Sequence, residues 1–400
     1  MDGVAKELRA LELSLLDQLD SQSCRPRSCH GVELVIRRVT LLECQRMPSA
    51  PAPISCDDRE LGSAIAEVEP DADRAAWLQA QLRGVEAACR VLGGEPAGYR
   101  ELVQRCYEVS VSEVNETQFQ RAHELILSGL PGTGSAAERF QAWAATQRVS
   151  GERLLVGLKA LAREFRARCR KQWDLPDGES VRFEMTPGPW AAYAEYKGGL
   201  QSVIRFSNEL PVMAWRMVEL VAHEAYPGHH TEHVFKDVAL VRAHNRKEFC
   251  AWVYPTPQAL IAEGIAMLAP TMLLGDEIEE LGAECLRPLG IDYDTAGSAV
   301  VREARGLLLP VAANLTRMSA ENEVDRDGML AYARKWRLDE DLYVERLVDY
   351  LCRPTWLPYE SCYPEGLQTC RLFVNGDPGR FSRLLTQQLT PAALERQAQS

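Results

Sequence analysis

Apolar residues recur at helical spacing through most of this 400-residue chain, which predicts a mainly α-helical protein. Two clear repeats lie near the N-terminus: Leu8, Leu11, Leu15, Leu16 and Leu19, and later Trp77, Leu78, Leu82, Val85, Ala88 and Leu92. The spacing predicts further helices over about 136–173, 295–317 and 325–352. We expect residues 1–130 to form a helical N-terminal scaffold that continues without a break into the rest of the structure.

The pattern changes to alternation between residues 180 and 206, where three short segments are typical of strands: Val181–Met185, Tyr193–Tyr196 and Ser202–Phe206. Gly198 and Gly199 suit a tight turn between the last two segments. We therefore predict a small antiparallel sheet or hairpin directly before the next helix. Its exposed edge would either hold an extended peptide by strand addition or have a purely structural role.

Five of the seven histidines lie within 22 residues: His223, His229, His230, His233 and His244. They follow an apolar helix for which Asn208 is a plausible N-cap and Pro211 falls in the first turn. Histidines in a protein core usually occur singly, whereas a His-Glu pair such as His223-Glu224 supplies a zinc hydrolase with a ligand and a general base. This cluster therefore predicts a zinc site.

The position of the second histidine ligand does not follow from periodicity alone. In a His-Glu-x-x-His helix it lies four residues after the first, but here that position is Pro227. A bulge at Pro227-Gly228 would act as a two-residue insertion and return His229 to a place one turn beyond His223. If the bulge has another shape, His230 takes that place. The same run also matches the inverted pattern H-x-x-E-H, with His229 and His233 as ligands and Glu232 as the base.

A third ligand is expected from the apolar stretch Ala259–Leu274, whose only charged residue is Glu263. An isolated buried carboxylate costs several kcal/mol, so Glu263 requires a cation or a hydrogen-bonding partner. A zinc ion held by His223, His229 and Glu263 would satisfy it, as would a buried arginine. Gly264 would let another backbone approach this helix closely.

The segment His223-Glu-Ala-Tyr-Pro-Gly-His-His230, followed by Ala262-Glu-Gly-Ile-Ala266, resembles the bacterial domain-of-unknown-function 885 family. The resemblance covers roughly residues 170–370 and includes the loop-like region around Trp356, Tyr359, Tyr363 and Gly366. It implies a gluzincin-like helical metallopeptidase fold, one zinc ion on His223, His229 and Glu263, and Glu224 as the base. Residues 131–400 would then form the catalytic region. The family often has tryptophan where this chain has Ile265, a change that alters the pocket wall and leaves the ligands in place.

These observations predict a zinc metallopeptidase or another metallohydrolase that cleaves a peptide or small amide. Glu224 would take the proton of the attacking water, and Tyr363, Tyr359 or His230 would steady the oxyanion. His233 and Glu219 are candidates for orienting a ligating ring. Two alternatives remain: a zinc enzyme acting on a non-peptide metabolite amide or by a lyase reaction, and a non-catalytic helical binding protein stabilised by zinc.

Composition limits the partners and the location of the protein. The net charge is −12, and the sequence has no basic stripe, so we expect no nucleic-acid partner. The N-terminus lacks the apolar core of a signal peptide and no long apolar run follows, so we expect a cytoplasmic protein without a membrane span. The twelve cysteines read as reduced thiols, and Cys24 and Cys29 only faintly resemble a metal knuckle. Oligomeric state cannot be predicted.

Overall fold

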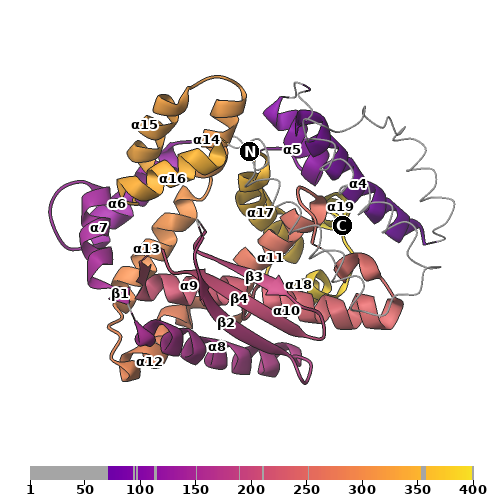
Figure 1. The fold of residues 1–400 in the computed structure, drawn as a ribbon, viewed down its shortest axis with the longest axis horizontal. Coiled ribbons are helices and arrows are strands. Elements are labelled where there is room, and N and C mark those ends of the chain that lie inside the picture. The colour runs from indigo at the N-terminus through magenta and orange to yellow at the C-terminus, as the bar shows by residue number, and fades with distance from the viewer. Residues whose placement is uncertain are drawn as a thin grey trace.

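The computed structural model describes residues 71–398 apart from 93, 94, 96, 97, 112–114, 150, 189, 210, 251 and 353–356. The leucine repeat before residue 20, the Cys24–Cys29 segment and Trp356 lie outside the described residues. The described part is mainly helical with small sheets, which confirms the predicted class (Figure 1).

Sixteen α-helices are assigned in the described part of the chain. They are α4 Ala72–Leu92, α5 Tyr99–Tyr107, α6 Thr117–Gly129, α7 Ala136–Thr146, α8 Glu152–Trp173, α9 Ala214–Glu224, α10 His229–Lys236, α11 Pro257–Leu273, α12 Ile278–Leu286, α13 Thr295–Leu308, α14 Val311–Ala320, α15 Arg326–Trp336, α16 Asp341–Leu351, α17 Cys362–Val374, α18 Pro378–Thr386 and α19 Pro391–Ala398. A π-helical turn, η1 (Asp237–Arg242), continues α10, and a short 3-10 helix, η6 (Tyr359–Ser361), leads into α17.

The single helix predicted over 136–173 is wrong, because the chain is interrupted between α7 and α8. Strand β1 (Arg148–Val149) pairs there with β5 (Val212–Met213), directly before the histidine helix. Gly151 has a φ of +64°, a value that favours glycine, and it precedes the first residue of α8. Apolar residues recur at helical spacing on both sides of this break and no proline marks it, which is why the sequence did not reveal it.

The three predicted strands are present as β2 (Ser180–Thr186), β3 (Ala192–Tyr196) and β4 (Gln201–Ser207), in the order β2-β4-β3. β3 and β4 form the predicted antiparallel hairpin, with Ala194 opposite Ile204. β2, however, pairs parallel to β4, with Phe183 opposite the same Ile204, so the sheet is mixed. The prediction of a purely antiparallel sheet is wrong because the β2–β3 connection carries the chain past β4 instead of forming a second hairpin.

The buried apolar side chains form two large clusters that both cross the boundary expected at residue 130. One contains Phe119 of α6 together with Leu351 of α16, and the other contains Tyr99 of α5 together with Ile265 of α11. The described N-terminal helices therefore share their cores with the later ones. Figure 1 shows α4 and α5 lying against the side of the molecule that holds α11 and α17.

Helix α11 is the central apolar helix, and most of its residues are buried. It packs so closely on α17 that a Cβ atom on Gly264 would overlap the carbonyl oxygen of Gly366, which confirms the expected close approach. Within the described residues, no single helix is long and apolar enough to cross a membrane. Pro257–Leu273 and Gly275–Leu289 meet that length and composition only when taken together, and the chain bends by 90° between them.

Candidate metal centre

Helix α9 carries His223 and Glu224 at its C-terminal end. Its apolar residues face the core, and the helix begins at Ala214, where the N-cap position is Met213. The expectation that Asn208 caps this helix is therefore wrong. The intervening residues Val212 and Met213 pair with β1 instead, because the extended backbone there completes a two-stranded ladder.

The break after Glu224 does bring His229 beside His223. The chain leaves the helix at Ala225 and passes Pro227, and α10 then starts at His229. The imidazole rings of His223 and His229 lie 4.7 Å apart at an angle of 88°. The predicted neighbourhood is confirmed, but it arises from one helix ending and another beginning, not from a two-residue bulge within one helix.

Gly228 makes this short connection possible. Its N–H donates to the carbonyl oxygen of Ala222 at 2.9 Å, so the chain folds back against the last turn of α9. A Cβ atom at this position would overlap the carbonyl oxygen of His223. Only glycine fits such an approach of backbone to backbone.

Glu263 of α11 completes a group of three ligand-type side chains. Its Oε2 lies 3.3 Å from Nε2 of His223, and its Oε1 lies 3.6 Å from Nε2 of His229. One ligand atom from each residue falls within 4.8 Å of the other two, a spacing that could hold a metal ion. We call His223, His229 and Glu263 the metal group.

The side chains of the metal group shift one another's pKa values. Burial would raise the pKa of Glu263, but the two histidines outweigh it and hold that pKa well below its usual range. Burial would likewise lower the pKa of His229, but the neighbouring carboxylates, Glu263 first, raise it well above its usual value. Within the described residues, Oε2 of Glu263 has no hydrogen-bond partner although it is buried. Two imidazoles and one carboxylate are a donor set that zinc accepts, so these residues fit such an ion.

Tyr359 supports the metal group from η6. Its hydroxyl donates to Oε1 of Glu263 at 2.7 Å, so it positions the carboxylate. The ring of Tyr363, at the start of α17, lies 5.7 Å from that of Tyr359 in an edge-on arrangement. The residues from 362 onward were expected to continue a loop, but they are helical and thus present Tyr363 from a rigid element.

The charge of Glu224 acts on the hydroxyl group of Tyr363. Burial raises the pKa of Tyr363 well above its usual value, and nearby carboxylates, including Glu263 and Glu224, add to the shift. Glu224 itself is 7% exposed, so little of this residue is accessible to solvent. A protonated phenol and a carboxylate beside one metal group can serve as a hydrogen-bond donor and a proton acceptor.

Two aromatic residues beside Tyr359 were not identified from the sequence. The ring of Tyr254 lies 5.7 Å from that of Tyr359, and the ring of Trp252 lies 6.3 Å from it. Both belong to the irregular segment before α11, where no periodicity marks them. They add an apolar wall next to the tyrosine that holds Glu263.

His230 does not face the metal group, so its geometry does not support the expected role in steadying an oxyanion. It is completely buried, with Nδ1 2.7 Å from Oγ of Ser202 and Nε2 3.1 Å from Oε2 of Glu179. Glu179 also accepts hydrogen bonds from Tyr226 and Arg166. This buried network, which the sequence analysis missed, ties the residues on both sides of Pro227-Gly228 to the sheet.

The inverted motif does not gather its residues into a ligand group. Glu232 accepts a hydrogen bond from Lys236, and its other oxygen lies 3.9 Å from Nδ1 of His229. His233 stacks on Tyr196 with ring centres 5.1 Å apart, and burial lowers its pKa to about 4. The contacts thus place Glu232 behind His229, where a carboxylate can orient a ligating ring.

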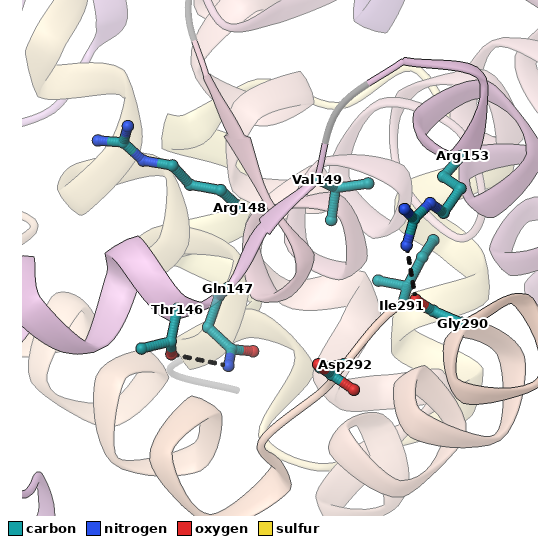
Figure 2. Close-up of a pocket in the computed structure, with 8 residues that line it drawn as sticks. All are labelled: Thr146, Gln147, Arg148, Val149, Arg153, Gly290, Ile291 and Asp292. Atoms are coloured by element: carbon teal, nitrogen blue, oxygen red, sulfur yellow. Dashed lines mark hydrogen bonds between the residues drawn. The ribbon is translucent and has the colours of Figure 1, made fainter.

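A separate pocket lies far from this chemistry in the chain, between the α7–α8 junction and the end of α12 (Figure 2). Its lining includes Arg153, which donates to the carbonyl oxygen of Gly290 at 3.0 Å. It shares no residue with the metal group and contains no histidine or cysteine. We assign no function to it.

Comparison with known proteins supports the fold and goes no further. No family model matches the chain, and no curated protein matches it. A solved structure described as "the putative lipoprotein from Colwellia psychrerythraea" is similar, with a TM-score of 0.57 and 13% sequence identity. The match covers 94% of this chain and 76% of that one, so the architecture is shared across nearly the whole molecule.

Proposed function

We propose that the protein is a zinc-dependent hydrolase that cleaves a peptide or another amide bond. The observation that carries the proposal is the metal group itself, with ligand atoms within 4.8 Å of one another and Glu224 next to one ligand in the chain. The resemblance of the His223–His230 and Ala262–Ala266 segments to the domain-of-unknown-function 885 family supports the same assignment, including its gluzincin-like character.

A bound zinc ion would polarise the amide carbonyl and make its water more acidic. Glu224 would accept a proton from the attacking water and deliver it to the leaving amine. The Tyr363 hydroxyl donates a hydrogen bond to the oxygen on which negative charge develops. Tyr359 holds Glu263 by a hydrogen bond, and Glu232 lies 3.9 Å from Nδ1 of His229, where it can orient that ring once the two approach.

The lining of the site is compatible with an extended substrate. β3 is at one edge of the three-stranded sheet, and α9 and α10 both contact it. An edge strand offers unpaired backbone groups to a peptide. This supports the peptide as the first substrate to test and a small metabolite amide as the second.

Metal analysis tests the proposal directly. Plasma mass spectrometry of the purified, unsupplemented protein should find close to one zinc ion per chain, and His223→Ala should abolish it. No transition metal, even after incubation with micromolar zinc, would rule the proposal out. With metal present, a peptide library and a panel of metabolite amides separate a peptidase from another amidohydrolase. Fractionation of expressing cells tests the predicted cytoplasmic location.

A further inference from the structure

A compact group of charged side chains follows the face of α9 that carries His223. Arg216, Glu219 and His223 are spaced by three and four residues, so they share one side of the helix. Seven residues of helix separate Arg216 from His223, which is about 10 Å along the axis. Arg305 of α13 and Arg337 with Asp339, from the α15–α16 connection, complete the group. We call Arg216, Glu219, Arg305, Arg337 and Asp339 the arginine cluster.

The arginine cluster holds three guanidinium groups and only two carboxylates. Arg216 pairs with Glu219, and Arg337 contacts Asp339 at 2.6 Å. Arg305 shares those same two carboxylates at longer range, 4.0 Å from Glu219 and 3.7 Å from Asp339. Within these five residues the guanidinium groups outnumber the carboxylates by one, and the carboxylates of Glu224 and Glu360 also act on Arg216 and Arg337, respectively.

Arg305 is the member whose hydrogen-bonding capacity is least satisfied. Its two ion pairs are both longer than a hydrogen bond, and its Nε is buried without a partner in the described part of the chain. Its guanidinium packs over Trp215, 5.1 Å from the ring centre, which fixes the plane of the fork. Burial lowers the pKa of Arg305, and the positive charge of Arg216 contributes. A carboxylate at the exposed part of this guanidinium is the ligand that such a group lacks.

The arginine cluster is partly exposed to solvent, and its residues on α9 lie about one to two helical turns before His223. The side chains of Arg305 and Arg216 are 22% and 29% exposed, respectively. Glu219 precedes His223 by four residues, so their side chains are neighbours on one face of α9. Burial raises the pKa of Glu360, the residue after Tyr359, to about 7. The positive charge of Arg337 lowers this pKa, and the negative charge of Glu263 raises it.

We infer that the arginine cluster binds a free carboxylate of the substrate, so that the enzyme acts on peptides or small amides that carry one. The inference rests on the proposed hydrolase function, since it concerns the substrate of that same site. An extended peptide advances roughly 3.4 Å per residue, so the spacing of about 10 Å between Arg216 and His223 along α9 corresponds to a carboxylate two or three residues beyond the cleaved bond. A C-terminal carboxylate at that distance makes the enzyme act near the ends of peptides, and their interior bonds are poor substrates.

The test uses the full-length, metal-free protein, so that binding is measured independently of zinc and of turnover. The probe is a pool of N-acetylated pentapeptides in two forms that differ only in a C-terminal carboxylate or carboxamide. Retention of each form in equilibrium dialysis is measured by mass spectrometry. We expect the wild type to retain the carboxylate form about tenfold better or more, the effect of one charge-assisted contact.

Substitutions assign that preference to the arginine cluster. Arg305→Met should bring the two forms close to parity, and Arg305→Lys should keep part of the preference because it retains the charge and loses the fork. Arg326→Met is the matched control, since Arg326 pairs with exposed Asp349 in another part of the molecule. Circular dichroism checks that each variant is folded, and the lysine variant replaces the methionine variant if the latter is not.

Three results would overturn the inference: equal retention of the two forms by the wild type, retention of neither form, and an unchanged preference in the folded Arg305 variants. Failure of the proposed function has a different signature, namely the absence of zinc or of hydrolysis in the metal-loaded protein. If the protein prefers the carboxylate peptides but binds no zinc, the arginine cluster is an anion-binding site and the proposed hydrolase function is wrong.

Discussion

The backbone of Gly228 lies directly against the carbonyl oxygen of His223, so closely that a Cβ atom on residue 228 would overlap that oxygen. The same atom would lie 2.8 Å from the carbonyl oxygen of Ala222. These contacts are with backbone atoms, which cannot rotate away as a flexible side chain would. The proximity of His223 and His229 thus depends on the absence of a side chain between them.

Gly228→Ala is expected to destabilise the protein by about 3 kcal/mol or more, because α9 and α10 must separate to accommodate the methyl group. The metal group should lose zinc at the same time. Urea unfolding and metal analysis measure the two effects. Gly306→Ala is the control: it lies on exposed α13 surface with no heavy atom within 4 Å of a new Cβ, and it should be neutral or stabilise by up to about 1 kcal/mol. A fully stable, zinc-binding Gly228→Ala protein would contradict this account of the break.

Glu224→Gln and Glu232→Gln should have different effects on zinc binding and on turnover. The first variant is expected to keep its zinc and lose about 10²–10⁴-fold in kcat, since the general base is removed. The second should weaken zinc affinity by about 10–100-fold and retain most turnover at saturating zinc, because Glu232 stands behind His229. Zinc titration and steady-state kinetics separate the two. Loss of turnover in Glu232→Gln alone would make Glu232 the base and restore the inverted motif.

The two tyrosines are also expected to differ. Tyr359→Phe removes the hydrogen bond to Oε1 of Glu263 and should weaken zinc binding by about tenfold. Tyr363→Phe should leave zinc affinity unchanged and lower kcat by about 100-fold, as expected when a donor to a developing oxyanion is lost. Competition with a chromogenic chelator measures the affinities. If both variants lose zinc and neither loses kcat at saturating metal, Tyr363 has no catalytic role.

The loss of unfolding free energy in acid should depend in part on Asp339. Burial would raise its pKa, but Arg337 and then Arg305 lower it to about 2, against about 3.9 in an unfolded chain. A lowered acid pKa stabilises the folded state above about pH 4, and the stabilisation disappears as the pH falls through 2. The gap in unfolding free energy between wild type and Asp339→Asn should be on the order of 2 kcal/mol at pH 6 and about half that at pH 3.

Urea unfolding at both pH values tests the Asp339 prediction. Asp341→Asn serves as the control, since its carboxylate is 74% exposed and pairs with Arg334 at the surface. It should change stability little at either pH. A gap for Asp339→Asn that stays constant or widens in acid would show that the arginines do not stabilise its ionised form.

The residues of the metal group followed from the sequence because their chemistry is unusual in its surroundings. A dense run of histidines suggests a metal ion, and a lone carboxylate in an apolar stretch requires a cation or a hydrogen-bond donor. His223, His229 and Glu263 indeed lie together. The helical class and the β3–β4 hairpin followed for a similar reason. Local periodicity and paired glycines specify them within a few residues of chain.

Features that depend on distant contacts could be decided only by the tertiary structure. The contacts of His230 could not be predicted, because its partners, Ser202 and Glu179, lie 28 and 51 residues away in the chain. The parallel pairing of β2 depends on the path of a connection and not on side-chain alternation. The arginine cluster draws on α9, α13 and the α15–α16 connection, and each arginine taken singly looks like an ordinary surface charge. The sequence by itself therefore determined which side chains could carry the chemistry. Packing between segments far apart in the chain decided which of them meet.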